Sequence, residues 1–223
     1  MRKRPVITVD GPSGAGKSTA AKALASALGY EYMDTGAMYR AVAYAYSREK
    51  QKPDLEPFLQ SLTLRFIFGQ PTQVFLNGED ISQKIRAPEI SMLASALSQD
   101  PRVRKYLTAM QRELGKEGGV VLEGRDTGSV VFPDAEVKFY LDANVAVRAQ
   151  RRHLELSAGV SGHAVGDALE QVKKEIEKRD KDDSEREIAP LIRPQGAHYI
   201  DTTGLDAEGV VRALKRHVER VSR

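Results

Sequence analysis

VDGPSGAGKSTA, residues 9–20, is the stretch that decides the fold, and within it residues 11–18 read G-x-x-x-x-G-K-S. A short β-branched run at residues 5–9 precedes this loop, and helix-forming residues 18–28 follow it and stop at Gly29. Glycine-rich loops between a strand and a helix bind the phosphates of nucleotides, because backbone N–H groups and the helix N-terminus face the anion. The sequence therefore predicts a nucleotide site at the start of an α/β fold.

Different residues of the loop are expected to contact different parts of the bound nucleotide. Gly11, Gly14 and Gly16 let the backbone bend so that its N–H groups face inward. We expect Lys17 to place its ammonium on the β and γ phosphates and the Ser18 hydroxyl to ligate Mg²⁺, with ATP or GTP as donor. The expected donor-binding residues are Gly11, Pro12, Ser13, Gly14, Ala15, Gly16, Lys17, Ser18 and Thr19.

The composition excludes several other classes of protein. The 223 residues include no Cys, which rules out a disulfide framework, a thiolate nucleophile and a Cys-ligated zinc site. The four His are scattered without metal-ligand spacing, and the net charge is only +3. No apolar run approaches the ~18–20 residues of a membrane span. We therefore expect a single cytoplasmic domain over residues 1–223 with no membrane partner.

Strand and helix patterns alternate along the rest of the chain. Further strands are expected at residues 30–33, 119–123, 137–141 and 198–201, and helices at residues 37–48, 88–97, 101–114 and 206–221. Strands separated by helices predict a parallel sheet, here of five strands, covered by helices on both faces. Residues 64–68 and 73–76, with a turn at Asn77 and Gly78, instead predict a small antiparallel insertion.

Three arginines share one face of an expected helix. Arg148, Arg151 and Arg152 are spaced i, i+3 and i+4. They precede residues 157–166, whose many small residues are typical of a mobile lid and equally of a plain surface loop.

A second charged face follows that segment. Arg179, Asp183 and Arg186 are spaced i, i+4 and i+7, which places them together if residues 167–187 are helical. Two basic faces on either side of one loop are suited to closing over a γ-phosphate and excluding water. Ordinary solvated surface, paired with nearby acidic residues, is the alternative for each cluster.

A GTPase switch is a weaker interpretation of the phosphate loop. Residues 201–204 match D-x-x-G, but they lie near the end of the chain, and the base-reading N-K-x-D does not occur in the sequence. We therefore favour a kinase over a switch.

Longer strings carry more information than the loop. They are DTGAMYR at residues 34–40, DPRVR at 100–104, EGRDTG at 123–128, VVFPDA at 130–135, and a segment from Arg179 to Leu191 that contains RD and APL. With residues 6–19, these strings resemble the bacterial cytidylate kinase family over nearly the whole chain. The antiparallel insertion is similar to the extra piece that family carries in its region for the nucleoside monophosphate (NMP).

The resemblance implies a fold and an activity, and we expect a monomer because no exposed apolar heptad in the sequence argues for assembly. It implies a P-loop α/β domain with an NMP-binding region at about 37–116, an insertion at 63–86 and a helical lid at about 145–187. The implied reaction transfers the γ-phosphoryl group of ATP to CMP or dCMP with Mg²⁺, giving ADP and CDP or dCDP in pyrimidine nucleotide metabolism. The implied partners are these small nucleotides, without nucleic acid.

The resemblance also implies the site residues. Arg40 and Arg125 would hold the acceptor phosphate, whereas Ser95, Arg104 and Asp126 would read the cytosine edge. The full implied CMP-binding set is Thr35, Arg40, Ser95, Arg104, Arg125, Asp126, Arg179, Asp183 and Arg186. Of these, Arg179 and Asp183 would address the sugar, and Arg186 would lie near the sugar or the phosphate. The implied catalytic and lid residues are Lys17, Arg148, Arg151 and Arg152.

Elementary chemistry agrees with that assignment. Cytosine differs from uracil at its exocyclic amine and N3, so a carboxylate and a guanidinium are suited to telling them apart. The attacking oxygen belongs to an ionised phosphate, so no Ser, Cys or His nucleophile is required. Asp34 and Glu123 are expected to orient neighbouring groups or to contact Mg²⁺ through water, although such a carboxylate can also simply cap a turn.

Two other functions remain open from the residues alone. A P-loop kinase for a different small molecule would share the donor site. A nucleic-acid-binding module would use the basic residues, but it has no need of the phosphate loop, and an aromatic content of 6% offers no stacking ladder.

Overall fold

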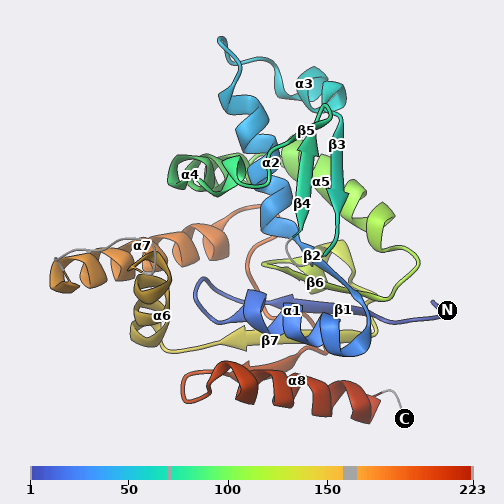
Figure 1. The fold of residues 1–223 in the computed structure, drawn as a ribbon, viewed down its shortest axis with the longest axis vertical. Helices are drawn as coiled ribbons and strands as arrows, with labels where there is room; N and C mark the ends of the chain where they lie inside the picture. The colour runs from blue at the N-terminus through green and yellow to red at the C-terminus, as the bar shows by residue number, and fades with distance from the viewer. Residues whose placement is uncertain (1, 70–71, 158–164, 222–223) are drawn as a thin grey trace.

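The strands of the central sheet are all parallel, as predicted. The computed structural model describes residues 2–69, 72–157 and 165–221. The five strands are β1 (Val6–Asp10), β2 (Glu31–Asp34), β6 (Val120–Gly124), β7 (Val137–Asp142) and β8 (His198–Asp201). Their order is β2-β6-β1-β7-β8 (Figure 1). The phosphate loop therefore leaves the central strand of the sheet.

Strand β1 is buried on both faces. Val6 packs into one apolar cluster, whereas Ile7 and Val9 pack into another on the opposite side of the sheet. Successive side chains of a strand point to opposite faces, so a doubly covered strand requires an almost continuous apolar run. This requirement explains why residues 5–9 lack the alternating pattern of a strand with one solvated face.

Two helices cover one face of the sheet. They are α1 (Lys17–Leu28) and α8 (Ala207–Val221). Leu24 of α1 and Leu214 of α8 are fully buried in one apolar cluster that also contains Phe139 of β7. Helix α1 ends where predicted, because Gly29 adopts a left-handed conformation with φ 62° and its N–H bonds to the last turn.

The opposite face carries four more helices and the insertion. The helices are α2 (Thr35–Ser47), α3 (Leu55–Ser61), α4 (Pro88–Leu97) and α5 (Pro101–Gly115). The insertion is an antiparallel sheet of β3 (Leu64–Ile67), β4 (Gln73–Leu76) and β5 (Glu79–Asp80), followed by a 3₁₀ turn at Lys84–Arg86. Val74 and Leu76 of β4 share the buried cluster of α2 and α5, so the insertion has no separate core.

Two helices extend away from the sheet on one side of the molecule (Figure 1). They are α6 (Val145–Ser157) and α7 (Val165–Glu185), and they pack together through Ala149, Val172 and Ile176. Most of the expected lid segment at residues 157–166 lies outside the described residues. Helix α7 ends at Glu185, so Arg186 follows the helix by one residue.

Three local features differ from the sequence expectations. Helix α3 and strand β5 are short, and their patterns are too brief for periodicity to reveal. A π-helical turn at Thr127–Val131 follows β6, and its first N–H groups donate to the side chain of Asp10, which is distant in sequence. None of the described helices is long and apolar enough to cross a bilayer.

The packing of α8 predicts a specific loss of stability. Leu214 is fully buried, so Leu214→Ala is expected to lower the free energy of unfolding by about 2–5 kcal/mol. Leu154 on α6 is 68% exposed, and Leu154→Ala is the matched control, with an expected change within about 0.5 kcal/mol. Urea unfolding followed by circular dichroism measures both. Equal losses would show that α8 is not part of the cooperative core.

Candidate active site

The phosphate loop is shaped by close approach of its neighbours. Gly11, Gly14 and Gly16 have φ values of 144°, 75° and 85°. A Cβ at Gly11 would lie 1.9 Å from the carbonyl oxygen of Leu141, and one at Gly14 would lie 2.8 Å from that of Arg148. Both positions therefore require glycine, for the backbone conformation and for space.

Lys17 lies inside this loop. It is only 6% exposed, and its Nζ donates to the carbonyl oxygen of Pro12 at 2.7 Å. Burial, and secondarily the positive charge of Arg125, lower the pKa of Lys17 to about 7. An anion bound in the loop would counter this effect and favour the charged ammonium.

Oxygen ligands gather beside the loop where Mg²⁺ is expected. The Ser18 hydroxyl and the Tyr32 hydroxyl both donate to Oε1 of Glu123, at 2.7 and 3.0 Å. Oε2 of Glu123 is buried and has no hydrogen-bond partner among the described residues. Burial, reinforced by the charge of Asp34, raises the pKa of Glu123. Mg²⁺ prefers hard oxygen ligands, so this hydroxyl and carboxylate fit the ion.

Asp34 has a different set of contacts. Its Oδ1 accepts the N–H of Ala37 at 2.9 Å and so caps helix α2, and its Oδ2 pairs with Arg40 at 3.0 Å. Asp34 thus orients Arg40 while capping the helix. Nε of Arg40 is buried and has no hydrogen-bond partner among the described residues.

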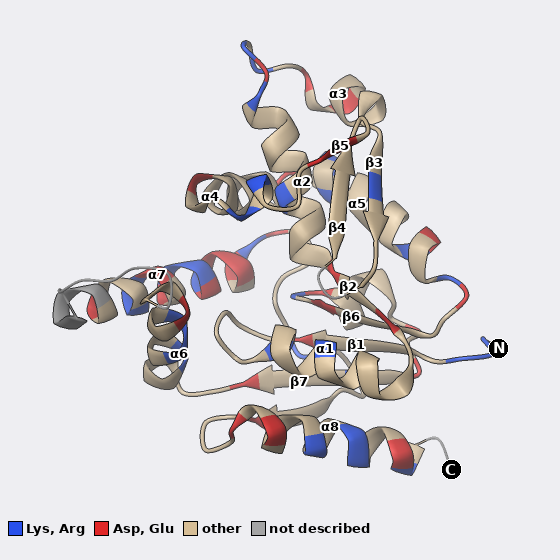
Figure 2. Cartoon of the chain, viewed as in Figure 1, with Lys and Arg blue, Asp and Glu red and all other residues tan. Residues whose placement is uncertain are grey.

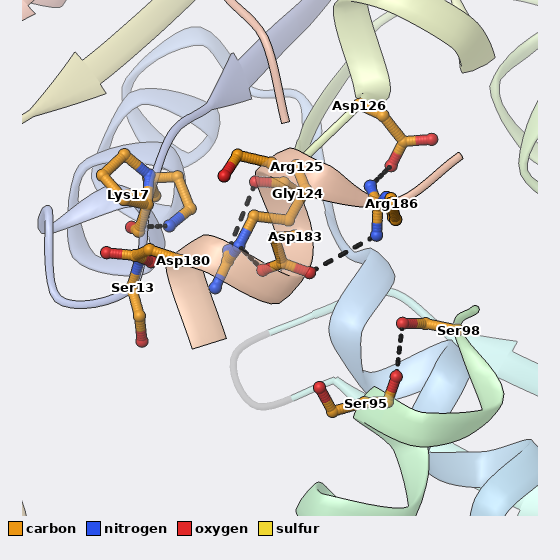
Figure 3. Close-up of polar contacts among 12 residues, drawn as sticks. Ser13, Lys17, Ser95, Ser98, Gly124, Arg125, Asp126, Asp180, Asp183 and Arg186 are labelled. Atoms are coloured by element: carbon orange, nitrogen blue, oxygen red, sulfur yellow. Dashed lines mark hydrogen bonds and ion pairs between the residues drawn. The ribbon is translucent and has the colours of Figure 1, made fainter. Parts of the chain in front are cut away.

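A buried network of alternating charges lies on the other side of the loop (Figure 3). Arg104 of α5 forms an ion pair with Asp126, whose second oxygen lies 3.6 Å from Arg186. Arg186 also contacts Asp183 at 3.4 Å, and Asp183 accepts from Nε of Arg125 at 2.9 Å. This charged network joins residues that follow β6 to helix α5 and to the end of α7.

The site also contains more guanidinium groups than this network pairs. Burial, and then the charge of Arg125, lower the pKa of Arg179 to about 10, and Arg40 and Arg152 contribute to the same shift. Guanidinium groups that repel one another in a buried site are stabilised by an added anion. The arrangement is suited to a phosphate group between these arginines.

One cavity of about 250 Å³ joins the phosphate loop to the charged network. Six of the predicted donor residues and all nine predicted CMP-binding residues line it. The six donor residues are Ser13, Gly14, Gly16, Lys17, Ser18 and Thr19. Ser95 of α4 lies on the wall opposite Asp183 and Arg186 (Figure 3). The structure thus brings the two predicted sets together, whereas the role of each residue stays a prediction.

The three predicted lid arginines have different surroundings. Arg152 lines the cavity and pairs with Glu155 at 3.0 Å. Arg148 and Arg151 are not among the lining residues. Arg148 instead donates to the carbonyl oxygen of Ser13 at 3.0 Å, and Arg151 donates to the Thr202 hydroxyl at 3.0 Å.

Sequence reasoning missed two residues that shape the site. Asp10 is fully buried, and its carboxylate accepts from the Thr127 hydroxyl and from the N–H groups of Thr127 and Gly128, at 2.7, 2.9 and 2.7 Å. It thereby fixes the turn that follows Asp126. The Arg104 guanidinium lies 5.6 Å from the centre of the Tyr39 ring. Tyr39 directly precedes Arg40 in the DTGAMYR string, and this position was the sequence signal that could have revealed it.

Comparison with known proteins decides the family. The family model described as cytidylate kinase matches residues 7–220. The chain belongs to the cytidylate kinase family. A cytidylate kinase of Bacillus cytotoxicus is 47% identical over 96% of each chain, and one of an Exiguobacterium species is 44% identical over 99% of each.

Solved structures support the fold of this family member. A shikimate kinase from Acinetobacter baumannii matches with a TM-score of 0.50 at 16% identity, covering 98% of this chain and 95% of that one. An uncharacterised protein from Eubacterium ventriosum matches with a TM-score of 0.52 at 12% identity, covering 97% and 99%. At these identities the likeness concerns the fold alone.

The buried position of Asp10 predicts a pH dependence. Burial raises the pKa of Asp10 from 3.8 to about 6. Between these values the folded state binds more protons than the unfolded state, so raising the pH lowers the free energy of unfolding. The gap corresponds to about 3 kcal/mol.

Comparison with Asp10→Asn isolates this contribution from other titrating groups. The difference in unfolding free energy, wild type minus variant, is expected to fall by up to about 3 kcal/mol from about pH 4 to pH 7. Urea titrations of both proteins at several pH values measure this difference. A constant difference would mean that Asp10 ionises at its ordinary pKa.

Proposed function

We propose that this chain transfers the γ-phosphoryl group of ATP to CMP or dCMP, giving ADP and CDP or dCDP in pyrimidine nucleotide metabolism. The observation that carries the proposal is that the phosphate loop and the charged network line the same cavity. A kinase needs both sites at once, because donor and acceptor phosphates must meet in line. Membership in the cytidylate kinase family supports the choice of acceptor.

Catalysis in this proposal depends on position and charge. Lys17 and the loop N–H groups hold the donor phosphates, Arg40 and Arg125 hold the acceptor phosphate, and Arg179 and Asp183 address its sugar. The acceptor's own phosphate oxygen attacks, so the protein needs no nucleophile. Mg²⁺, when bound, would neutralise charge on the β and γ oxygens, held through Ser18 and Glu123.

Base selection is assigned to the buried pair of Arg104 and Asp126. A carboxylate accepts from the N4 amine of cytosine, whereas uracil presents an acceptor oxygen at the same position. The guanidinium can donate to N3 or O2 of the base. Ser95 faces the same cavity and would contribute a further polar contact.

The proposal also assigns regions of the chain to the acceptor site and to the lid. Residues at about 37–116 form the acceptor region, because Arg40, Ser95 and Arg104 line the cavity from α2, α4 and α5. Residues at about 145–187 form the lid.

Both signs of charge alternate along α7 and α8 (Figure 2), which favours nucleotides over nucleic acid as partners. Because ATP and CMP are metabolites inside cells, we place the enzyme, as a monomer, in the cytoplasm.

The acceptor assignment is tested with a panel of nucleoside monophosphates. With ATP and Mg²⁺, the purified protein is expected to phosphorylate CMP and dCMP at least about ten times faster than UMP, AMP or GMP. A coupled assay for ADP measures the rates at equal acceptor concentrations. Preference for another monophosphate or a non-nucleotide acceptor would overturn the assignment.

The base-reading role is tested with Asp126→Asn. The amide presents a donor to uracil O4, so the ratio of kcat/KM for CMP to that for UMP is expected to fall about ten-fold or more. The control Asp134→Asn changes an exposed acid in an ion pair with Arg2, away from the cavity, and is expected to keep the ratio. An unchanged ratio in a folded Asp126→Asn variant would place base recognition elsewhere.

A further inference from the structure

The phosphate loop is attached to helix α7 by one carboxylate. Asp180 of α7 accepts the backbone N–H of Ser13 at 3.1 Å (Figure 3). Ser13 belongs to the predicted donor loop, and 167 positions of sequence separate the two residues. A backbone N–H that donates to a carboxylate is held in one direction, so this contact fixes the orientation of the Ser13 peptide within the loop.

Arg148 completes the attachment from helix α6. Its Nη1 donates to the carbonyl oxygen of Ser13 at 3.0 Å and also forms an ion pair with Asp180. Its Nε donates to the carbonyl oxygen of Ala143 at 2.9 Å, which holds the guanidinium in place from the other end. Both polar groups of the Ser13 backbone are therefore bound by one pair of opposite charges.

Packing reinforces this attachment. A Cβ at Gly14 would lie 2.9 Å from Cβ of Arg148, so the loop rests directly on α6. The side chains of Arg148 and Asp180 are 10% and 17% exposed. Ion pairs shielded from solvent to this degree are geometrically better defined than exposed ones, and loss of one partner leaves the other uncompensated.

We propose that Asp180 and Arg148 form a brace that positions the phosphate loop for ATP. The brace acts through Ser13 and touches no reacting atom, so both are positioning residues. The inference rests on the proposed ATP-dependent function, and it gives Arg148 a role at the loop in place of one at the lid. It also links the donor loop to the helix that carries Arg179 and Asp183, which line the acceptor side of the cavity.

The brace is tested by binding measurements on two Asp180 variants. Asp180→Ala removes both contacts, and we expect the Kd for ATP to rise about ten-fold or more. Asp180→Asn keeps an acceptor for the Ser13 N–H but loses the ion pair, so a smaller rise is expected. The Kd for CMP, measured by calorimetry without ATP, is expected to stay within about two-fold in both variants.

Two comparisons separate positioning from a general structural effect. Asp182→Asn changes an exposed acid on the same helix and is expected to keep the wild-type Kd for ATP. Arg148→Ala with Asp180→Ala is expected to weaken ATP binding no more than the stronger single variant, because both act through Ser13. Equal weakening of ATP and CMP would show that Asp180 only supports α7, and would overturn the brace.

The outcome for the wild-type protein distinguishes the two proposals. If the wild type binds ATP and phosphorylates CMP while Asp180→Ala keeps the wild-type Kd for ATP, the brace is wrong and the proposed function stands. If the wild type binds no ATP, the proposed function and the brace are both wrong.

Discussion

The buried ion pair between Arg104 and Asp126 is the interaction on which the site depends. Burying either charge alone is costly, and a single missing partner leaves the other without compensation. The side chains are 5% and 9% exposed, so water does little to stabilise them. Their elements, helix α5 and the segment after β6, must therefore meet in one arrangement. Asp126 then holds Arg186 as well, which brings the end of α7 to the same place.

Asp10 extends this constraint to the phosphate loop. It is the last residue of β1, directly before the loop, and it binds the turn that carries Thr127 and Gly128. The phosphate loop and the charged network therefore share a boundary at the adjacent strands β1 and β6. Phosphoryl transfer depends on fixed distances between two charged substrates, and a boundary of this kind keeps those distances constant.

Much of the fold could be predicted because its signals are local. The loop at residues 11–18 reveals a strand before it and a helix after it, and Gly29 marks the end of that helix. Helix spacing likewise places Arg148, Arg151 and Arg152 on neighbouring turns. The targets of these arginines could not be predicted, because Ser13 and Thr202 are 135 and 51 positions away in the sequence. Spacing shows which residues share a face, but it does not show what that face contacts.

The distribution of charge explains why the site is built on so many elements. The cavity receives its guanidinium groups from α2, α5, α6, α7 and the segments after β6 and α7. Arginines that come from separate elements leave room for carboxylates between them, which lowers their mutual repulsion. Asp126 lies between Arg104 and Arg186, and Asp183 lies between Arg125 and Arg186. Arg179 retains a lowered pKa among its positive neighbours, so the remaining imbalance lies at the cavity, where a phosphate group would correct it. An anion bound at this place would therefore gain more from these arginines than from arginines that are already paired with carboxylates.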